Sequence, residues 1–371
     1  MPESVIKKMD NKAIKKIVVL GLGRIGATIA HNLSNCADYQ VTAADINKTV
    51  VDKCNKYFNS QLITDNKFDD ILKGQHAVVS ALSFNENPMV AQAALRQGCS
   101  YFDLTEDIEC TRKIKEIASK AKADQIFMPQ CGLAPGFVGI LAFGFCHEFE
   151  ILDTLKLRVG ALPEFPSNQM MYNLTWSTEG LVNEYANSCE SIKNHELTEL
   201  EPLEGREILS ISGIEYEAFN TSGGLANLCY SLKGKIRELT YKTIRYPGHC
   251  ELMRFLFRDL RLGEMGKRRN MLMEILDSSV AKTEQDIVLV SVVATGWLDK
   301  ILMQKSRNFL IKNSHGKSAI QLSTAAGLCT VLDLFMSGEL KGHGFVEQES
   351  IDIKTFLNNR FAKLYKDSEL K

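Results

Sequence analysis

The chain has 371 residues, with 44 Lys and Arg against 45 Asp and Glu, a net charge of -1 and 45% hydrophobic residues. This composition is typical of a globular protein and excludes collagen-like and extensively disordered chains. The charge balance also argues against a nucleic-acid partner, because such a partner requires a basic surface. We expect a small-molecule partner and two domains, since a single hydrophobic core rarely grows to this size.

Cysteine and histidine spacing gives no sign of a metal or redox site. The ten cysteines form no CxxC pair and the seven histidines show no HxxxH spacing, so we predict no metal. The charged N-terminal segment has no apolar stretch, and no run approaches the ~18 consecutive apolar residues that a membrane helix needs. We therefore expect a cytoplasmic protein with reduced thiols and no membrane partner.

Short apolar runs alternate with segments of helical periodicity in the first third of the chain. Strands are predicted at residues 15–22, 39–46, 60–65, 76–82, 100–105 and 125–130. Helices are predicted between them at residues 24–35, 47–58, 68–73, 86–97 and 107–124. This alternation predicts an α/β domain with a doubly wound parallel sheet.

The pattern changes after Gly132. Long amphipathic strands are predicted at residues 154–162, 230–246, 284–297 and 301–313, with helices at 249–262 and 318–338. We expect a second α+β domain with a mixed, largely antiparallel sheet over residues 133–317. Residues 1–132 and about 318–371 would form the first domain, leaving a cleft at the hinge.

A glycine motif lies between the first predicted strand and helix. Gly21, Gly23 and Gly26 form GxGxxG, in which the glycines permit a tight turn, close approach of a pyrophosphate and close helix–strand packing. The helix that begins near Arg24 and Ile25 would point its N–H groups at the phosphates. The motif and its context predict a dinucleotide-binding domain of the Rossmann type.

Two aspartates bear on the choice of cofactor. Asp45 ends the second predicted strand, roughly 20 residues past the glycines, where a carboxylate binds ribose hydroxyls. Because a carboxylate there repels a 2′-phosphate, we predict NAD as the cofactor. Lys48 would soften this repulsion, so NADP stays open. Asp65, which ends the third strand, is either a neighbour of the adenine or a solvated turn residue.

The fourth and fifth predicted strands end on the same rim of the sheet, where open parallel sheets bind their ligands. The fourth strand ends in Ser80, Ala81, Leu82 and Ser83, which would lie near the nicotinamide end of the cofactor. Asp103 ends the fifth strand. A carboxylate partly desolvated there could have a pKa suited to a general base.

For three further residues the sequence favours a structural role over a catalytic one. Glu106 and Asp107 are predicted to lie in the first turn of the helix that follows, where the helix dipole favours carboxylates. Cys131 is predicted to be a small buried residue, because no sequence-adjacent histidine would activate its thiol.

Four segments in matching order resemble the saccharopine dehydrogenase-like family, which contains saccharopine reductases, lysine 6-dehydrogenases and carboxynorspermidine dehydrogenases. They are the glycine loop, PQCGLAPGF (129–137), TWSTEGLVNEY (175–185) with EYEAFNTSGGL (215–225), and KTIRYPGHCE (242–251). The resemblance implies a pyridine-nucleotide oxidoreductase acting on a C–N bond of a lysine-related amino acid. The segment GLAPG, with Ala134, resembles the corresponding segment of lysine 6-dehydrogenases. Fungal saccharopine reductases usually carry an acidic residue at the position of Ala134.

Amine oxidation requires an oriented substrate and a proton acceptor beside the cofactor. Arg245 in the RYPGH segment is the first candidate for a substrate carboxylate, since a guanidinium makes two parallel hydrogen bonds; otherwise it pairs with a surface acid. His249 would relay a proton or cap the following helix. Glu179 is a candidate for a substrate ammonium. Trp176 and Tyr246 would wall an aliphatic chain or belong to the core.

Three functions fit these residues: a lysine 6-dehydrogenase-like oxidative deamination, a saccharopine or carboxynorspermidine dehydrogenase, and a nucleotide-binding sensor without turnover. Saccharopine has three carboxylates, so its binding site would need several positively charged side chains. The family-like segments supply Arg245 and His249 as cations against the acids Asp103, Glu179, Glu184 and Glu217. This balance favours lysine or a similar diamino acid. A homodimer is expected, because amphipathic strands leave a sheet edge for a partner.

Overall fold

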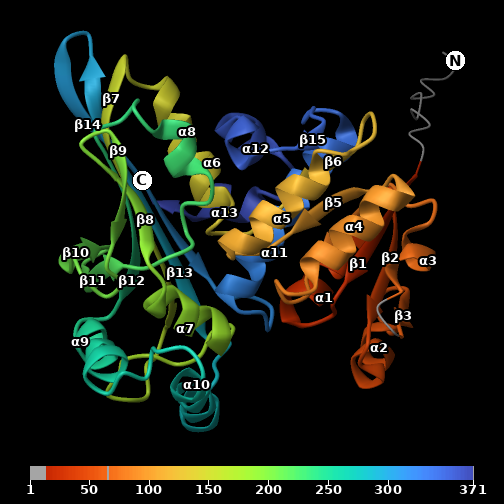
Figure 1. Cartoon of the computed structure of the whole chain (residues 1–371), viewed down its shortest axis with the longest axis horizontal. Coiled ribbons are helices and arrows are strands. Elements are labelled where there is room, and N and C mark those ends of the chain that lie inside the picture. Colours follow the sequence, from red (N-terminus) through yellow and green to blue (C-terminus); the bar gives the residue numbers. More distant parts are fainter. Residues whose placement is uncertain (1–13, 65–66, 371) are drawn as a thin grey trace, which may run out of the picture.

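The computed structural model describes residues 14–64 and 67–370, so Asp65 lies outside the described residues. Two β-sheets stand side by side, and helix α11 (Ala319–Ser337) runs between them (Figure 1). The first sheet comes mainly from the N-terminal third of the chain and gains one strand from near the C-terminus. The strands of the second sheet all come from the region after Gly132.

The first sheet has parallel strands in the order β15-β6-β5-β4-β1-β2-β3. They are β1 (Lys15–Leu20), β2 (Tyr39–Asp45), β3 (Ser60–Leu62), β4 (Ala77–Ser80), β5 (Ser100–Asp103), β6 (Ile126–Met128) and β15 (Gly344–Phe345). The strand order reverses between β1 and β4, which leaves a crevice at their carboxyl ends. The predicted doubly wound parallel sheet is confirmed.

Helices cover both faces of this sheet. They are α1 (Arg24–Ser34), α2 (Lys48–Cys54), α3 (Phe68–Leu72), α4 (Asn87–Gln97) and α5 (Ile108–Ala118). Successive residues of a strand point to opposite faces. Accordingly, Val19 belongs to the buried cluster that contains Ile29 of α1, and Val18 belongs to the cluster that contains Ile114 of α5. Burial on both faces explains why these strands read as continuous apolar runs.

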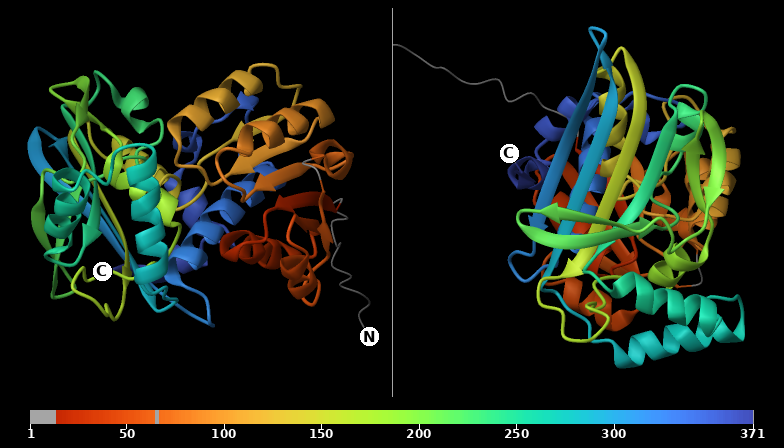
Figure 2. Two further views of the ribbon diagram at one scale, coloured as in Figure 1. Left: turned by 60° about the horizontal axis from the view of Figure 1, so that its bottom comes forward. Right: turned by 90° about the vertical axis from the view of Figure 1, so that its left-hand side faces the viewer.

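The second sheet is mixed and largely antiparallel, as predicted. Its strands are β7 (Ile151–Pro163), β8 (Cys189–Lys193), β9 (Glu196–Leu200), β10 (Glu207–Ile211), β11 (Ile214–Asn220), β12 (Glu238–Arg245), β13 (Asp286–Leu298), β14 (Ile301–Lys312) and β16 (Glu369–Leu370). Strands β12 and β7 pair in parallel, whereas the other described pairs are antiparallel. The long strands β7, β13 and β14 run alongside one another (Figure 2).

The structure corrects two details of the second half. The predicted strand 230–246 is wrong in its first part, where α8 (Leu228–Leu232) ends and Gly234 turns the chain with a φ of +74°. The predicted helix 249–262 is α9 (His249–Arg254), which continues as a π-helical turn at Phe255–Asp259. The remaining helical segments are α6 (Phe137–Gly144), α7 (Thr178–Ala186), α10 (Lys267–Ser279), α12 (Ile353–Asn358), α13 (Lys363–Ser368) and the 3-10 turns Phe145–His147 and Gln348–Ser350.

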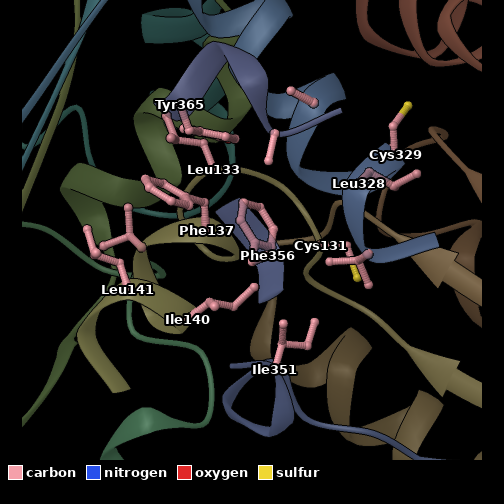
Figure 3. Packing of buried hydrophobic residues seen from close by; sticks show 14 of the residues in the cluster. Cys131, Leu133, Phe137, Ile140, Leu141, Leu328, Cys329, Ile351, Phe356 and Tyr365 are labelled. Atoms are coloured by element: carbon pink, nitrogen blue, oxygen red, sulfur yellow. The ribbon is translucent and has the colours of Figure 1, made fainter. Parts of the chain in front are cut away.

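The C-terminal part of the chain contacts both sheets. Helix α11 has the length and composition of a membrane-spanning segment, but 72% of that segment is buried inside the protein. The ring of Phe137 stacks on that of Tyr365, with the centroids 3.9 Å apart, and lies 5.5 Å from that of Phe356 (Figure 3). These contacts fix α6 against α12 and α13. The start of α11 lies beside the glycine loop, where Gln321 Nε2 donates a hydrogen bond of 2.9 Å to the carbonyl oxygen of Arg24.

Candidate active site

A cavity of about 600 Å³ opens between the two sheets. One wall comes from the glycine loop and the carboxyl ends of β4 and β5, and the other from β7, β12 and the region of α7. The start of α11 and the GLAPG segment at residues 132–135 close the cavity between them. The crevice of the doubly wound sheet therefore opens onto the second domain.

The glycine loop is shaped to receive a phosphate group. A Cβ atom on Gly26 would lie 1.9 Å from the carbonyl oxygen of Gly21, so this position requires glycine for close packing. A Cβ on Gly23 would meet nothing within 4 Å, which shows open space in front of the loop. Gly23, Arg24, Ile25 and Gly26 all line the cavity. Helix α1 has no side-chain cap, so its first N–H groups are available to an anion.

Asp45 stands beside this loop. Its Oδ2 accepts a hydrogen bond of 2.7 Å from Leu22 N, and its Oδ1 accepts one of 2.8 Å from Asn47 N. The carboxylate therefore braces the glycine loop. Asp45 lies outside the lining of the cavity, and its contact with a ribose stays a prediction. Lys48 pairs with Asp52 at 2.9 Å within α2, so its charge is partly neutralised there.

Of the four residues at the end of β4, three line the cavity and one is buried in the core. Ala81, Leu82 and Ser83 line the cavity. Ser80 lies outside the lining, because it is buried and its Oγ donates a hydrogen bond of 2.7 Å to Asn87. The small residues predicted beside the nicotinamide thus begin one position later than expected.

Asp103, the predicted base, lies outside the lining residues. Its carboxylate is fully buried and accepts hydrogen bonds from Tyr101 Oη at 2.6 Å, Gln130 N at 2.9 Å and Thr105 N at 3.0 Å. Burial raises the pKa of Asp103 to about 6, against the opposing effect of these bonds. In this arrangement Asp103 holds the β5–α5 loop against the segment that leaves β6.

Arg245 lies in the cavity wall at the end of β12 and is 2% exposed. Its Nε donates to Tyr185 Oη at 2.8 Å, and its Nη1 donates to the carbonyl oxygen of Ile244 at 2.9 Å. The guanidinium carbon lies 5.0 Å from the ring centroid of Tyr172. These bonds leave Nη2 without a partner in the described part of the chain, so Nη2 can donate to a ligand in the cavity.

His249 does not line the cavity and is linked to Arg245 through the hydroxyl group of Tyr185. Its Nε2 lies 3.0 Å from Tyr185 Oη and its Nδ1 lies 2.8 Å from the carbonyl oxygen of Met170. Arginine only donates and a carbonyl only accepts, so the Tyr185 hydroxyl must donate to Nε2 and Nδ1–H to Met170. Burial, with the charge of Arg245, lowers the pKa of His249 to about 3. His249 is therefore neutral and contributes no positive charge.

Three carboxylates line the cavity. Glu179 is exposed in the first turn of α7, whereas Glu184 and Glu106 lie deeper. Burial raises the pKa of Glu184 to about 8; Arg245 opposes this rise and Glu106 adds to it. Burial also raises the pKa of Glu106. Because burial penalises the charged form, these two groups hold protons more tightly than ordinary glutamates.

The structure also shows where the remaining residues singled out from the sequence lie. Tyr246 lies outside the lining, since its hydroxyl donates to the carbonyl oxygen of Pro163. Trp176 does line the cavity. Glu217 caps α9 by accepting from Cys250 N at 2.6 Å. Both carboxylates precede the predicted first turn: Asp107 is the N-cap of α5, and its neighbour Glu106 lines the cavity.

The described part of the chain shows no sign of a reactive cysteine at Cys131 or of a metal site. Cys131 is 1% exposed, and burial holds the pKa of its thiol well above the usual range. Within residues 14–64 and 67–370, no group of three or more His, Cys, Asp or Glu side chains could hold a metal ion.

Sequence comparison places the geometry in a family. The saccharopine dehydrogenase NADP binding domain matches residues 17–128, and the saccharopine dehydrogenase C-terminal domain matches residues 132–367. The chain belongs to the saccharopine dehydrogenase family. The resemblance drawn from the four segments is thereby confirmed, and the family's nucleotide-binding domain shows a nicotinamide cofactor.

One solved structure shares the fold of almost the whole chain. The apo saccharopine dehydrogenase (L-Glu forming) from Saccharomyces cerevisiae superposes with a TM-score of 0.80 at 16% identity, covering 96% of this chain and 99% of that one. The C. glutamicum DAP dehydrogenase in complex with DAP gives a TM-score of 0.48 at 8% identity, covering 94% and 98%. At these identities the likeness concerns the fold alone.

The residues present fit the family's cofactor. Gly23 and the uncapped start of α1 would hold the pyrophosphate, and Asp45 would face the adenosine ribose. When bound, the cofactor supplies the oxidising power for the reaction. The chain's own residues must bind the substrate, orient it and manage its protons. We therefore conclude that this member of the saccharopine dehydrogenase family is an oxidoreductase.

Proposed function

We propose that the enzyme oxidatively deaminates lysine or a similar diamino acid with NAD(P). The observation that carries this proposal is the charge distribution in the deep part of the cavity. One buried guanidinium, that of Arg245, faces the same space as Glu184 and Glu106. This set suits a substrate with one carboxylate and an additional amino group.

Each part of a diamino acid has a matching group. Arg245 would bind the substrate carboxylate through its free Nη2, because charge-assisted bonds from a guanidinium are strong. Leu82 and Trp176 offer apolar surface for an aliphatic chain. The carboxyl groups of Glu106 and Glu184 would accept from the side-chain ammonium. Together these contacts would hold the reacting carbon near the glycine loop.

Saccharopine fits this cavity less well. Its three carboxylates would require further cations, and the two other cations of the lining are already paired. Arg24 lies 3.4 Å from Glu284 and Lys282 lies 3.5 Å from Asp277. A buried carboxylate without a partner is costly, so saccharopine would have to break these pairs. We keep saccharopine dehydrogenase as the alternative because the family's name supports it.

The product of the reaction tests the proposal. Oxidative deamination of lysine releases ammonia, whereas oxidation of saccharopine at its secondary amine releases an amino acid. We expect incubation with NAD and lysine to release ammonia in proportion to the NADH formed. Release of glutamate from saccharopine, without ammonia from lysine, would favour the alternative.

A further inference from the structure

Glu106 and Glu184 approach the cavity from opposite domains. Glu106 follows β5 of the first sheet, whereas Glu184 lies in α7 beside the second sheet. Neither side chain makes a hydrogen bond to another residue in the part of the chain that the structure describes. Both residues are half-buried and line the cavity, so donors for their carboxyl groups have to come from solvent or from a ligand in the cavity. Their shared cavity is therefore a place where a ligand would supply the missing donors.

The charged and titratable groups around Glu184 come from several elements. Arg245 and Tyr241 of β12, Tyr172, Cys189 of β8 and Glu106 all interact with it electrostatically. Burial raises the pKa of the tyrosines and of the cysteine, which leaves them neutral at pH 7. Among the described residues, Arg245 is thus the cation that acts on Glu184, and the neighbouring carboxyl group of Glu106 opposes it.

We propose that Glu106 and Glu184 form a subsite for the side-chain ammonium of the substrate, and that Glu184 releases a proton to solvent when the ammonium binds. The inference rests on the proposed function and names the groups that select a diamino acid. On binding, the carboxyl O–H bond of Glu184 breaks, its proton passes to the buffer, and the carboxylate accepts an N–H hydrogen bond. Because the pKa of free Glu184 is about 8, the group is mostly protonated at pH 7.

The subsite also explains how a proton leaves the substrate. An ammonium group must lose a proton before its carbon can be oxidised to the imine level. The Glu184 carboxylate, once formed, lies beside the ammonium as an acceptor, so the N–H bond can break while the O–H bond of Glu184 forms again. Arg245 cannot accept a proton, and His249 lies behind Tyr185 outside the lining.

Calorimetry measures the predicted proton release. Lysine and norleucine, which lacks the side-chain ammonium, would be titrated at pH 7 into the full chain saturated with NADH, with which lysine cannot be oxidised. Comparing two buffers of different ionisation enthalpy gives the number of protons released. We expect close to one proton for lysine and none for norleucine. The lysine affinity should rise up to about tenfold per pH unit below pH 8.

Three variants assign the proton. Glu184→Gln should abolish the release and weaken lysine binding at least tenfold, while norleucine binding changes little. Glu106→Gln removes a charge that raises the pKa of Glu184, so the midpoint of proton release should shift to lower pH. Glu349→Gln is the matched control, because Glu349 is also a buried glutamate with a raised pKa but lies outside the cavity lining. Its proton release and its lysine affinity at pH 7 should equal those of the parent.

The outcomes separate the subsite from the proposed function. Unchanged proton release and an unchanged lysine-to-norleucine affinity ratio in Glu184→Gln would overturn the subsite. Titration with n-butylamine tests the subsite without a substrate carboxylate. If both amines bind with proton release but lysine yields no NADH from NAD, the subsite stands and the proposed function fails. If neither amine binds with proton release, the subsite is wrong.

Discussion

The Nε atom of Arg245 donates a hydrogen bond of 2.8 Å to the hydroxyl oxygen of Tyr185, which in turn lies 3.0 Å from His249 Nε2. All three side chains are buried. The chain of donors has one consistent direction, so it fixes the orientation of the guanidinium in the cavity wall. Tyr185 and His249 are in this account positioning residues for Arg245.

Tyr185→Phe should weaken substrate binding through Arg245. The substitution removes one hydroxyl and leaves two buried groups without a partner, which costs ~1–3 kcal/mol. We expect the KM for lysine to rise roughly tenfold with a smaller change in kcat. Steady-state kinetics measure the split. Tyr230→Phe is the control, because Tyr230 is exposed and its hydroxyl bonds Glu190; equal effects of the two substitutions would remove Tyr185 from this role.

Arg245→Lys keeps the positive charge but loses the planar guanidinium and the fixed bond to Tyr185. We expect a higher KM for the amino acid and nearly unchanged affinity for NAD, measured by kinetics and by cofactor titration. A fall in cofactor affinity together with thermal stability, and no change in KM, would show that Arg245 serves the fold instead of the substrate.

Asp45→Asn should change cofactor preference without collapsing the glycine loop. The amide retains one oxygen for the N–H of Leu22, loses the acceptor for the N–H of Asn47, and loses the charge that repels a 2′-phosphate. We expect the NADP-to-NAD affinity ratio to rise by ~1–3 kcal/mol in free energy. Asp70→Asn, an exposed residue of α3, is the control. An affinity ratio that stays constant in Asp45→Asn would separate this residue from the ribose.

Glu349 gives a prediction about stability and pH. Both of its carboxyl oxygens are buried without a hydrogen-bond partner, and burial raises its pKa from 4.5 to about 7. The folded state therefore holds this proton more tightly than the unfolded state. The resulting stabilisation is complete below pH 4.5 and is lost as the pH rises through about 7.

Glu349→Gln should consequently match the parent near pH 5 and be more stable at pH 8, by at most ~3 kcal/mol. Thermal melts at the two pH values measure the difference. A variant that melts at the same temperature as the parent at pH 8 would contradict the assignment of a raised pKa to Glu349.

Local patterns explain what the sequence could predict. The strands of the first sheet are buried on both faces and read as apolar runs, and the glycine loop is a contiguous motif. Strands β9 and β10 were missed because most of their residues are exposed or half-buried, so no apolar run marks them. The predicted extension of β12 failed because Gly234 and α8 interrupt it.

The site depended on contacts that no local pattern reveals. Asp103 was predicted as a base from its place at a strand end, but Gln130 and Asn87 come from distant segments to bury it. Glu106 and Glu184 lie far apart in the chain and line the same cavity. The sequence names Glu184 among the acids of the family-like segments, but its position in the chain does not reveal that it lies beside Arg245 and Glu106.

We propose that the enzyme oxidises a diamino acid in preference to saccharopine. The most direct measurement is the initial rate of absorbance increase at the reduced nicotinamide band, with NAD or NADP and either lysine or saccharopine at matched concentrations near neutral pH. The account predicts a higher kcat/KM for lysine, lowered in Arg245→Lys. Robust formation of reduced cofactor from saccharopine, with none from lysine, would contradict it.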